Sequence, residues 1–173
     1  MFKKNLQNWY KIIFRHHRHD TKLKSIEWLY HCHLAARQKK ITSALLLKDN
    51  TESRLNLLAI FLAIVLLEMA DKKLRQAILN RVVYEIDDSY RQEGVHDMVV
   101  GKRVKALTAK LYARLFRYHK VFLSGNKKNL TKLLIFYFGT AKKTHSPHLV
   151  EYFFDCQKHI KKNKTTPSLP SIK

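Results

Sequence analysis

Glycine and proline are scarce in this sequence, since only four glycines and three prolines interrupt its 173 residues. These residues mark the turns of β sandwiches and barrels, so their scarcity disfavours such folds. We find no strand-like alternation bounded by turn pairs and no internal repeat at solenoid periods. Leucine, lysine and alanine are frequent and favour long helices. The sequence predicts an all-α fold, a single compact bundle of about six or seven helices.

Cysteine is also rare, and the two cysteines, Cys32 and Cys156, form no CxxC pair. A disulfide framework is therefore not expected, and a reducing compartment is the simpler interpretation. Histidines cluster at residues 16–19 and 31–33. Neighbours at i and i+2 on a helix point in different directions, whereas zinc ligands on one helix usually sit at i and i+3 or i+4. We expect no metal and no cofactor.

Motifs that carry catalysis are missing as well. Gly94 and Gly101 lack the surrounding pattern of a phosphate-binding loop, and no serine elbow or EF-hand loop is present. Asp87 and Asp88 are adjacent, so on a helix their carboxylates diverge, and nothing nearby supplies a nucleophile. We expect no catalytic residue, no small-molecule substrate and no enzyme activity.

Acidic residues are few, with 13 Asp and Glu against 34 Lys and Arg, and the formal net charge is +21. Such a charge favours anionic partners, either phospholipid headgroups or RNA, and does not choose between them. No acid occurs from Met98 to Val150. The one acidic concentration precedes this segment and consists of Glu85, Asp87, Asp88, Glu93 and Asp97.

The first segment, Phe2 to Arg18, contains no acid and has the pattern of a basic amphipathic helix. Its apolar side carries Phe2, Leu6, Trp9, Tyr10, Ile13 and Phe14, and its basic side carries Lys4, Lys11, Arg15 and Arg18. Two interpretations are open: the helix lies on an anionic membrane surface, or it packs on the core. A cleaved organellar presequence is disfavoured because serine is absent and lysine is common.

The apolar run Leu57–Leu67 is too short to cross a bilayer, which needs roughly 20 apolar residues. We interpret it as a central buried helix that follows N-capping residues at 49–51. Upstream, one helix is expected over about 22–38, followed by a short stretch at 41–47. Downstream, Asp71 is expected to cap a helix whose core positions are Leu74, Ile78, Val82, Ile86 and Tyr90.

Gly94 is expected to end that helix, and the next helix begins near Val99. Its core stripe is Val100, Val104, Leu107, Leu111, Leu115, Tyr118 and Phe122, and its basic stripe is Arg103, Lys110, Arg114 and Arg117. A turn at 124–126 precedes a sixth helix, and Ser146 with Pro147 begins a last one. We divide the chain into an amphipathic helix (1–20), a helical domain (21–161) and a disordered tail (162–173).

The segment from Glu85 to Lys105 resembles the signature of the ubiquinol-cytochrome c chaperone family. Members typically read Gly-Val-Gly-Asp, two residues, then Gly-Lys-Arg-Val-Lys. Gly94, Val95 and Asp97 match the first block, and Gly101, Lys102, Arg103, Val104 and Lys105 match the second. The chain departs from the pattern at His96, where members have glycine, and at Phe61, where a histidine is typical.

The resemblance implies a helical protein that helps to assemble the respiratory cytochrome bc complex. Its expected client is newly made cytochrome b or another subunit of that complex, and the ribosome is a further expected contact. The resemblance also implies a peripheral location, at the cytoplasmic face of the bacterial inner membrane or the matrix side of the mitochondrial one.

Residues of the motif have two expected roles. Gly94 takes a positive φ to reverse the chain, Asp97 caps the following helix, and Asp87 pairs with Lys102 or Arg103 across the hairpin. The structural set is Asp87, Gly94, Val95, Asp97, Gly101 and Val104. The expected partner-binding set is Lys102, Arg103, Lys105, Arg114, Tyr90 and Tyr112, with Tyr118 as a further aromatic candidate.

The rival prediction is RNA or ribosome binding by the basic helices, whose affinity would fall steeply as salt rises. We find no aromatic stacking motif of the RNA-recognition or OB type. The prediction of an assembly chaperone therefore comes first.

Overall fold

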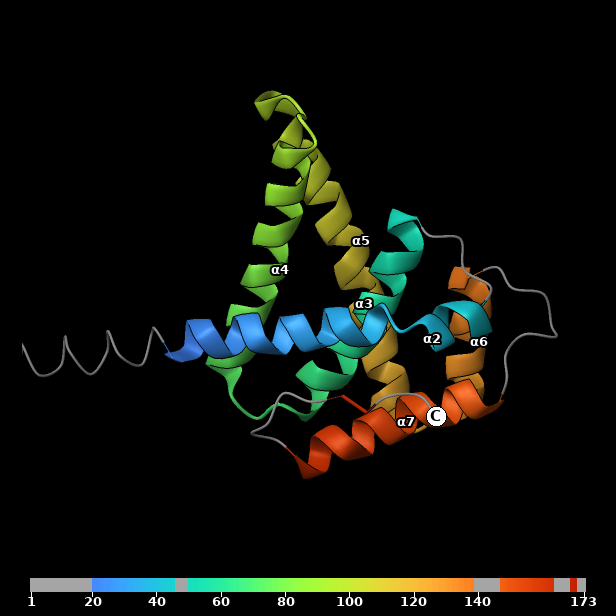
Figure 1. The fold of residues 1–173 in the computed structure, drawn as a ribbon. Coiled ribbons are helices and arrows are strands. Elements are labelled where there is room, and N and C mark those ends of the chain that lie inside the picture. Colours follow the sequence, from blue (N-terminus) through green and yellow to red (C-terminus); the bar gives the residue numbers. More distant parts are fainter. Residues whose placement is uncertain (1–19, 46–49, 139–146, 164–168, 171–173) are drawn as a thin grey trace, which may run out of the picture.

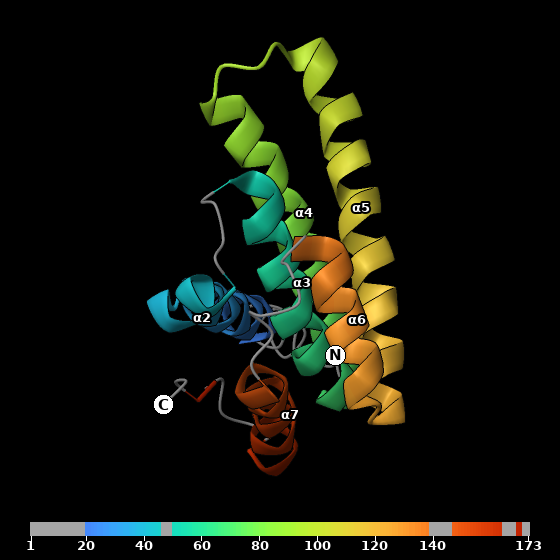
Figure 2. The ribbon, with the colours of Figure 1, turned by 90° about the vertical axis from the view of Figure 1, so that its right-hand side faces the viewer.

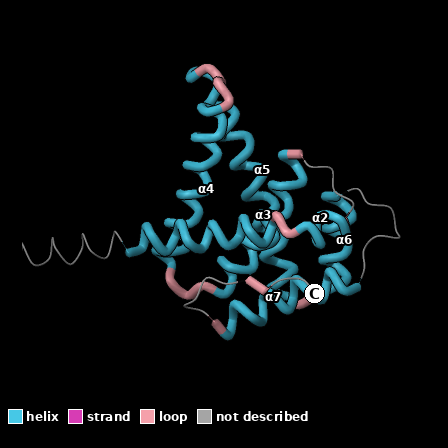
Figure 3. Tube along the Cα trace, viewed as in Figure 1, coloured by secondary structure: helices cyan, strands magenta, loops and turns pink. Residues whose placement is uncertain are grey.

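A computed structural model describes residues 20–45, 50–138, 147–163 and 169–170. These residues are helical apart from short connections and include no strand (Figure 3), so the predicted all-α fold is confirmed. A helix over residues 20–36 comes first. It is followed by α2 (Lys39–Ala44), α3 (Thr51–Glu68), α4 (Lys72–Gln92), α5 (Asp97–Ser124), α6 (Lys127–Phe138) and α7 (Pro147–Lys162). The predictions for residues 1–19 lie outside the described residues.

Helix α3 is the centre of the bundle, and every residue from 55 to 65 is buried. It packs against α5, α6 and α7, and the ring of Phe61 lies 5.6 Å from that of Phe153 on α7. The interpretation of this apolar run as a buried helix is confirmed. In the part of the chain that the structure describes, no helix is long and apolar enough to cross a membrane.

Side-chain acceptors start the helices where the sequence predicted caps. Asn50 Oδ1 accepts a hydrogen bond from the backbone N–H of Ser53 at 2.8 Å, at the start of α3. Asp71 Oδ1 accepts from the backbone N–H groups of Lys73 and Leu74 at the start of α4. Because these N–H groups have no partner inside the helix, each cap stabilises its helix by about 1 kcal/mol.

Helices α4 and α5 form a hairpin that leaves the body of the molecule (Figures 1 and 2). The predicted stripes are buried near the body and mostly less so toward the bend, where the buried Val100 is the exception. On α4, Leu74, Ile78 and Val82 are buried, whereas Ile86 and Tyr90 are half-buried. On α5, Leu111, Leu115, Tyr118 and Phe122 are buried, whereas Val104 and Leu107 are half-buried. We call the outer part of the hairpin, residues 84–108, the arm.

The C-terminal helix α7 closes the bundle beneath α3. Gln157 Nε2 of α7 donates a hydrogen bond to Glu68 at the end of α3, at 2.7 Å. Of the predicted disordered tail, the structure describes Asn163, Leu169 and Pro170 beyond the end of α7. Leu169 packs against the core, and Pro170 O accepts a hydrogen bond from Tyr152 Oη at 2.8 Å, so at these two positions the tail contacts the body.

Replacing Phe61 by alanine should lower the free energy of unfolding by about 3–5 kcal/mol, because it opens a cavity in the centre of the bundle. Phe136→Ala is the matched control: that ring is 69% exposed, and its loss should change stability by less than about 0.5 kcal/mol. Urea unfolding followed by circular dichroism measures both values. Equal losses in the two variants would contradict a core centred on α3.

Candidate functional site

The bend of the arm is built around Gly94, which has a φ of +73°. Its N–H donates to Arg91 O at 3.0 Å, and the N–H of Val95 donates to Tyr90 O at 3.1 Å. This pair of bonds is the Schellman pattern, which satisfies the last carbonyls of α4 and needs a residue that tolerates a positive φ. Gly94 therefore ends α4 in the conformation that the sequence predicted.

The start of α5 differs from the prediction. The N-cap is His96, whose Nδ1 accepts from the backbone N–H of Met98 at 3.4 Å, and Asp97 is the first residue of the helix. The Asp97 side chain instead accepts from Arg91 at 2.6 Å. The expectation that Asp97 caps α5 is wrong, because His96 occupies the N-cap position and its side chain accepts the bond from the helix.

The expected pairing of Asp87 with Lys102 or Arg103 is also wrong. Asp87 pairs with Arg91, one turn later on α4, at 2.7 Å. Arg91 thus joins Asp87 to Asp97 across the bend. These groups are exposed and water screens their charges, so the bridge orients the bend more than it stabilises it.

The expected partner-binding residues divide into two groups. Lys102, Lys105 and Tyr112 are exposed on α5, and the two lysines form no ion pair within the described residues. Arg103 instead has its guanidinium carbon 6.0 Å from the ring centroid of Tyr90 on α4. Tyr90 and Arg103 therefore face each other across the arm.

Arg114 does not belong to a solvated basic face, because it is 5% exposed. It forms an ion pair with Glu52 of α3, and its guanidinium lies over the ring of Tyr137 on α6. Its Nε and Nη1 atoms are buried and have no hydrogen-bond partner among the described residues. Tyr118, one turn later, is fully buried. Arg114 and Tyr118 are thus parts of the core and not of a partner surface.

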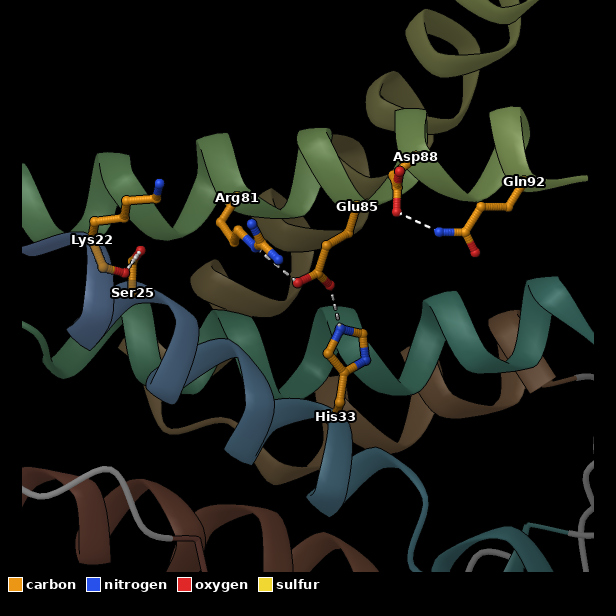
Figure 4. A network of polar contacts seen from close by, with 7 residues as sticks. All are labelled: Lys22, Ser25, His33, Arg81, Glu85, Asp88 and Gln92. Atoms are coloured by element: carbon orange, nitrogen blue, oxygen red, sulfur yellow. Dashed lines mark hydrogen bonds and ion pairs between the residues drawn. The ribbon is translucent and has the colours of Figure 1, made fainter.

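A polar contact joins the helix over residues 20–36 to the base of the arm (Figure 4). His33 Nε2 lies 3.0 Å from Glu85 Oε2, and Arg81 Nε donates to Glu85 Oε1 at 3.1 Å. Burial by itself raises the pKa of Glu85, but the hydrogen bonds and charges of His33 and Arg81 outweigh it, so the pKa of Glu85 is lowered. Glu85 therefore anchors the arm while it is ionised.

His31, Cys32 and His33 are neighbours in sequence, but the helix over residues 20–36 points their side chains in different directions. Cys32 is fully buried, His33 faces Glu85, and the ring of His31 lies 5.8 Å from that of Tyr30. Burial raises the pKa of the Cys32 thiol to about 12. These side chains point in different directions and do not form one ligand set.

Two residues that sequence reasoning did not assign to partner binding stand out on α5. Met98 is 88% exposed at the start of the helix. Gly101 lies within the helix, and a Cβ atom built there would meet no atom within 4 Å. The signal that could have pointed to Met98 is its place beside the glycine, since both precede the basic block on the same side of the helix.

The described residues form an all-helical protein with a projecting arm that exposes charged and apolar side chains. A model of the family described as ubiquinol-cytochrome C chaperone matches residues 43–164, which is more than half of the chain. The chain therefore belongs to the ubiquinol-cytochrome c chaperone family, and the resemblance seen in residues 85–105 is confirmed. The matched region contains α3 to α7 and the whole arm.

A solved structure supports the fold. The crystal structure of the Cbp3 homolog from Brucella abortus is similar to this chain with a TM-score of 0.78 and 20% sequence identity. The similarity covers 94% of this chain and 97% of that one. At this identity the likeness shows a shared fold. No curated protein sequence matches the chain.

Glu52→Ala should lower the free energy of unfolding by about 1–3 kcal/mol, because it leaves the buried Arg114 charge without its carboxylate. Arg114→Met should cost less than about 1 kcal/mol, because it removes the charge and keeps a side chain of similar length. Urea unfolding compares the two variants. A larger loss in Arg114→Met than in Glu52→Ala would contradict this account of the pair.

Stability should fall in acid in a way that depends on Glu85. A carboxyl whose folded pKa is lowered stabilises the fold above its unfolded value, near 4.5, and loses this contribution as the pH falls through the folded value. The stability difference between the wild type and Glu85→Gln should be largest above about pH 5 and shrink below pH 4. Urea unfolding at a series of pH values tests this, and parallel pH profiles would refute it.

Proposed function

We propose that this protein is an assembly chaperone that binds a newly made subunit of the ubiquinol-cytochrome c reductase complex, with cytochrome b as the expected client. Membership of the chaperone family supports the assembly role. The arm supports binding, because it leaves the body and exposes side chains that the fold does not use (Figure 1). The client site proposed here is the outer side of α5.

Four residues define this site, and we call them the α5 stripe: Met98, Gly101, Lys105 and Tyr112. They follow one another at spacings of three, four and seven residues, so they lie along one side of the helix. Met98 is 88% exposed and Tyr112 is 42% exposed. A flexible thioether and an amphipathic ring suit a surface that accepts apolar helices of varied sequence.

Gly101 is the observation that carries the proposal. A glycine inside a helix destabilises it by roughly 0.5–1 kcal/mol relative to alanine. Among the described residues nothing offsets this cost, because Gly101 lies in a regular helix and a Cβ there would meet no described neighbour within 4 Å. A missing side chain on an exposed helix does allow another backbone to approach closely. An exposed glycine with open space around it therefore supports a partner that approaches α5 closely at this point.

The charges around the stripe favour the same use. Lys102 and Lys105 are exposed and have no ion pair within the described residues. The carboxylates of Asp87 and Asp97 at the bend already form ion pairs with Arg91. The lysines of α5 are therefore available to a client. They would contact acidic residues, or carbonyl groups without partners, at the end of an apolar client helix.

Ribosome binding is the second candidate, and the charge of +21 together with the acid-free segment 98–150 favours it. Phosphate contacts would make such binding fall steeply with salt. A chaperone that receives a newly made chain has reason to bind near the ribosome, so the two functions are compatible. They differ in the molecule that contacts the α5 stripe.

Gly101→Ala should raise the free energy of unfolding by roughly 0.5–1 kcal/mol and yet weaken client capture at least fivefold. The added methyl favours the helix but prevents the close approach of a partner. Ala106→Gly, at an exposed position of α5 outside the stripe, is the matched control: it should destabilise the helix and leave capture unchanged. In-cell crosslinking of the tagged protein, followed by identification of the captured chain, measures capture.

A complex-subunit polypeptide, cytochrome b above all, is the expected capture product. Full capture by Gly101→Ala would show that the α5 stripe is not the client site. Recovery of ribosomal RNA in place of a subunit would favour the second candidate.

A further inference from the structure

Helix α5 runs beside α6 at its end away from the bend (Figure 2). Four large apolar side chains of these two helices are exposed. They are Phe116 (61% exposed), Leu123 (68%), Ile135 (41%) and Phe136 (69%). The core does not use them, and Phe116 and Leu123 continue the side of α5 that carries the α5 stripe, four and eleven residues beyond Tyr112. An exposed apolar cluster of this size marks an interaction surface.

Cations lie directly against these rings. Lys120 Nζ is 4.4 Å from the ring centroid of Phe116, and the guanidinium carbon of Arg117 is 5.6 Å from that of Phe136. Arg117 Nη1 also donates to Tyr137 Oη at 2.8 Å, which fixes its position between the two helices. Lys128 and Lys132 are exposed on α6 at helical spacing from Ile135 and Phe136.

We propose that this surface, the α5–α6 face, binds an anionic phospholipid bilayer. It consists of the apolar residues Phe116, Leu123, Ile135 and Phe136 and the cations Arg117, Lys120, Lys128 and Lys132. The apolar tips enter the boundary between headgroups and acyl chains, while the flexible cations stay at the level of the phosphates. The inference goes beyond the proposed client site and does not depend on it.

Charge selects the occupant of the face. The segment 98–150 contains no acid, so a second copy that offered the same face would meet cations with cations. Residues 1–19 are acid-free too and cannot neutralise it. A bilayer with anionic headgroups matches the cations wherever they lie.

Side-chain chemistry separates a bilayer from RNA or a partner helix. Bases stack on rings, so RNA could use Phe116 and Phe136 but gains nothing from exposed Leu123 and Ile135. A docked helix would bury Lys120 and Arg117, which lie among the apolar tips, and a buried charge is costly without a partner. A lipid surface accommodates the tips and the cations together.

The test uses the full-length chain and co-sedimentation with vesicles of phosphatidylcholine alone or mixed with phosphatidylglycerol. The wild type should bind the mixed vesicles, and Leu123→Ser/Phe136→Ser should bind them about tenfold more weakly. Leu23→Ser/Tyr30→Ser is the matched control, because it removes two exposed apolar side chains from the helix over residues 20–36. Its binding should equal that of the wild type, and circular dichroism should show unchanged helicity in both variants.

A second measurement reports where the bilayer lies. Phe136→Cys, labelled with a polarity-sensitive fluorophore, should shift its emission to the blue on mixed vesicles, whereas labelled Tyr30→Cys should not. Cys32 and Cys156 are buried, and burial raises the pKa of both thiols to about 12, so the label goes to the introduced thiol.

Each contrary outcome overturns the proposal. If the double variant binds vesicles as the wild type does, or if variant and control lose equal binding, lipid binds elsewhere. Emission from the label at residue 136 that does not shift on vesicles would show the same. If the double variant keeps vesicle binding but loses binding to ribosomal RNA, the face is an RNA surface. Client capture by Gly101→Ala is measured separately, so the two proposals fail independently.

Discussion

Burial of α3 on every side is the constraint on which the rest of the structure depends. Because residues 55–65 are all buried, apolar faces of α5, α6 and α7 must surround this helix. Helix α5 uses mainly its C-terminal half for that purpose, from Leu111 to Phe122. Its N-terminal half is left to pair with α4. The α5 half of the arm is thus the part of this helix that the core does not need.

Several acidic side chains form ion pairs that join parts of the fold. Glu52 neutralises buried Arg114, Glu85 joins the helix over residues 20–36 to α4, and Asp87 and Asp97 share Arg91 at the bend. The net charge of +21 comes from the excess of 34 Lys and Arg over 13 Asp and Glu. No acid follows Asp97 on α5 and α6, so the exposed cations of these two helices have few carboxylates near them in sequence. An anionic partner can therefore meet unpaired positive charge on these helices.

Local patterns predicted the fold well because the forces behind them are local. Apolar periodicity located the core stripes of α4 and α5, and short polar side chains marked the caps at Asn50 and Asp71. Gly94 marked the bend because a positive φ is a property of single residues. The prediction for Arg114 failed for the opposite reason. Its place in the core depends on Glu52, 62 residues earlier, and on the packing of α6.

The site predictions failed in the same manner where they depended on two elements meeting. Asp87 has a partner one turn away on its own helix, and this local pair takes precedence over one across the hairpin. Arg103 belongs to the basic block in sequence, yet the approach of α4 places it against Tyr90. Sequence periodicity assigns a residue to a side of its helix. It does not say which sides a neighbouring helix will cover.

Helix α5 carries residues of both proposed surfaces and holds them on one rigid element. Gly101 and Leu123 lie in one uninterrupted helix, so a rise of 1.5 Å per residue places them roughly 33 Å apart. The body clamps the C-terminal half, while the Schellman turn and the Arg91 bridge brace the other end. The proposed stripe ends at Tyr112 and the proposed face begins at Phe116, one turn later on the same helix. If both proposals hold, a newly made membrane subunit bound to the stripe would lie beside the lipid that it must enter and away from other exposed apolar chains.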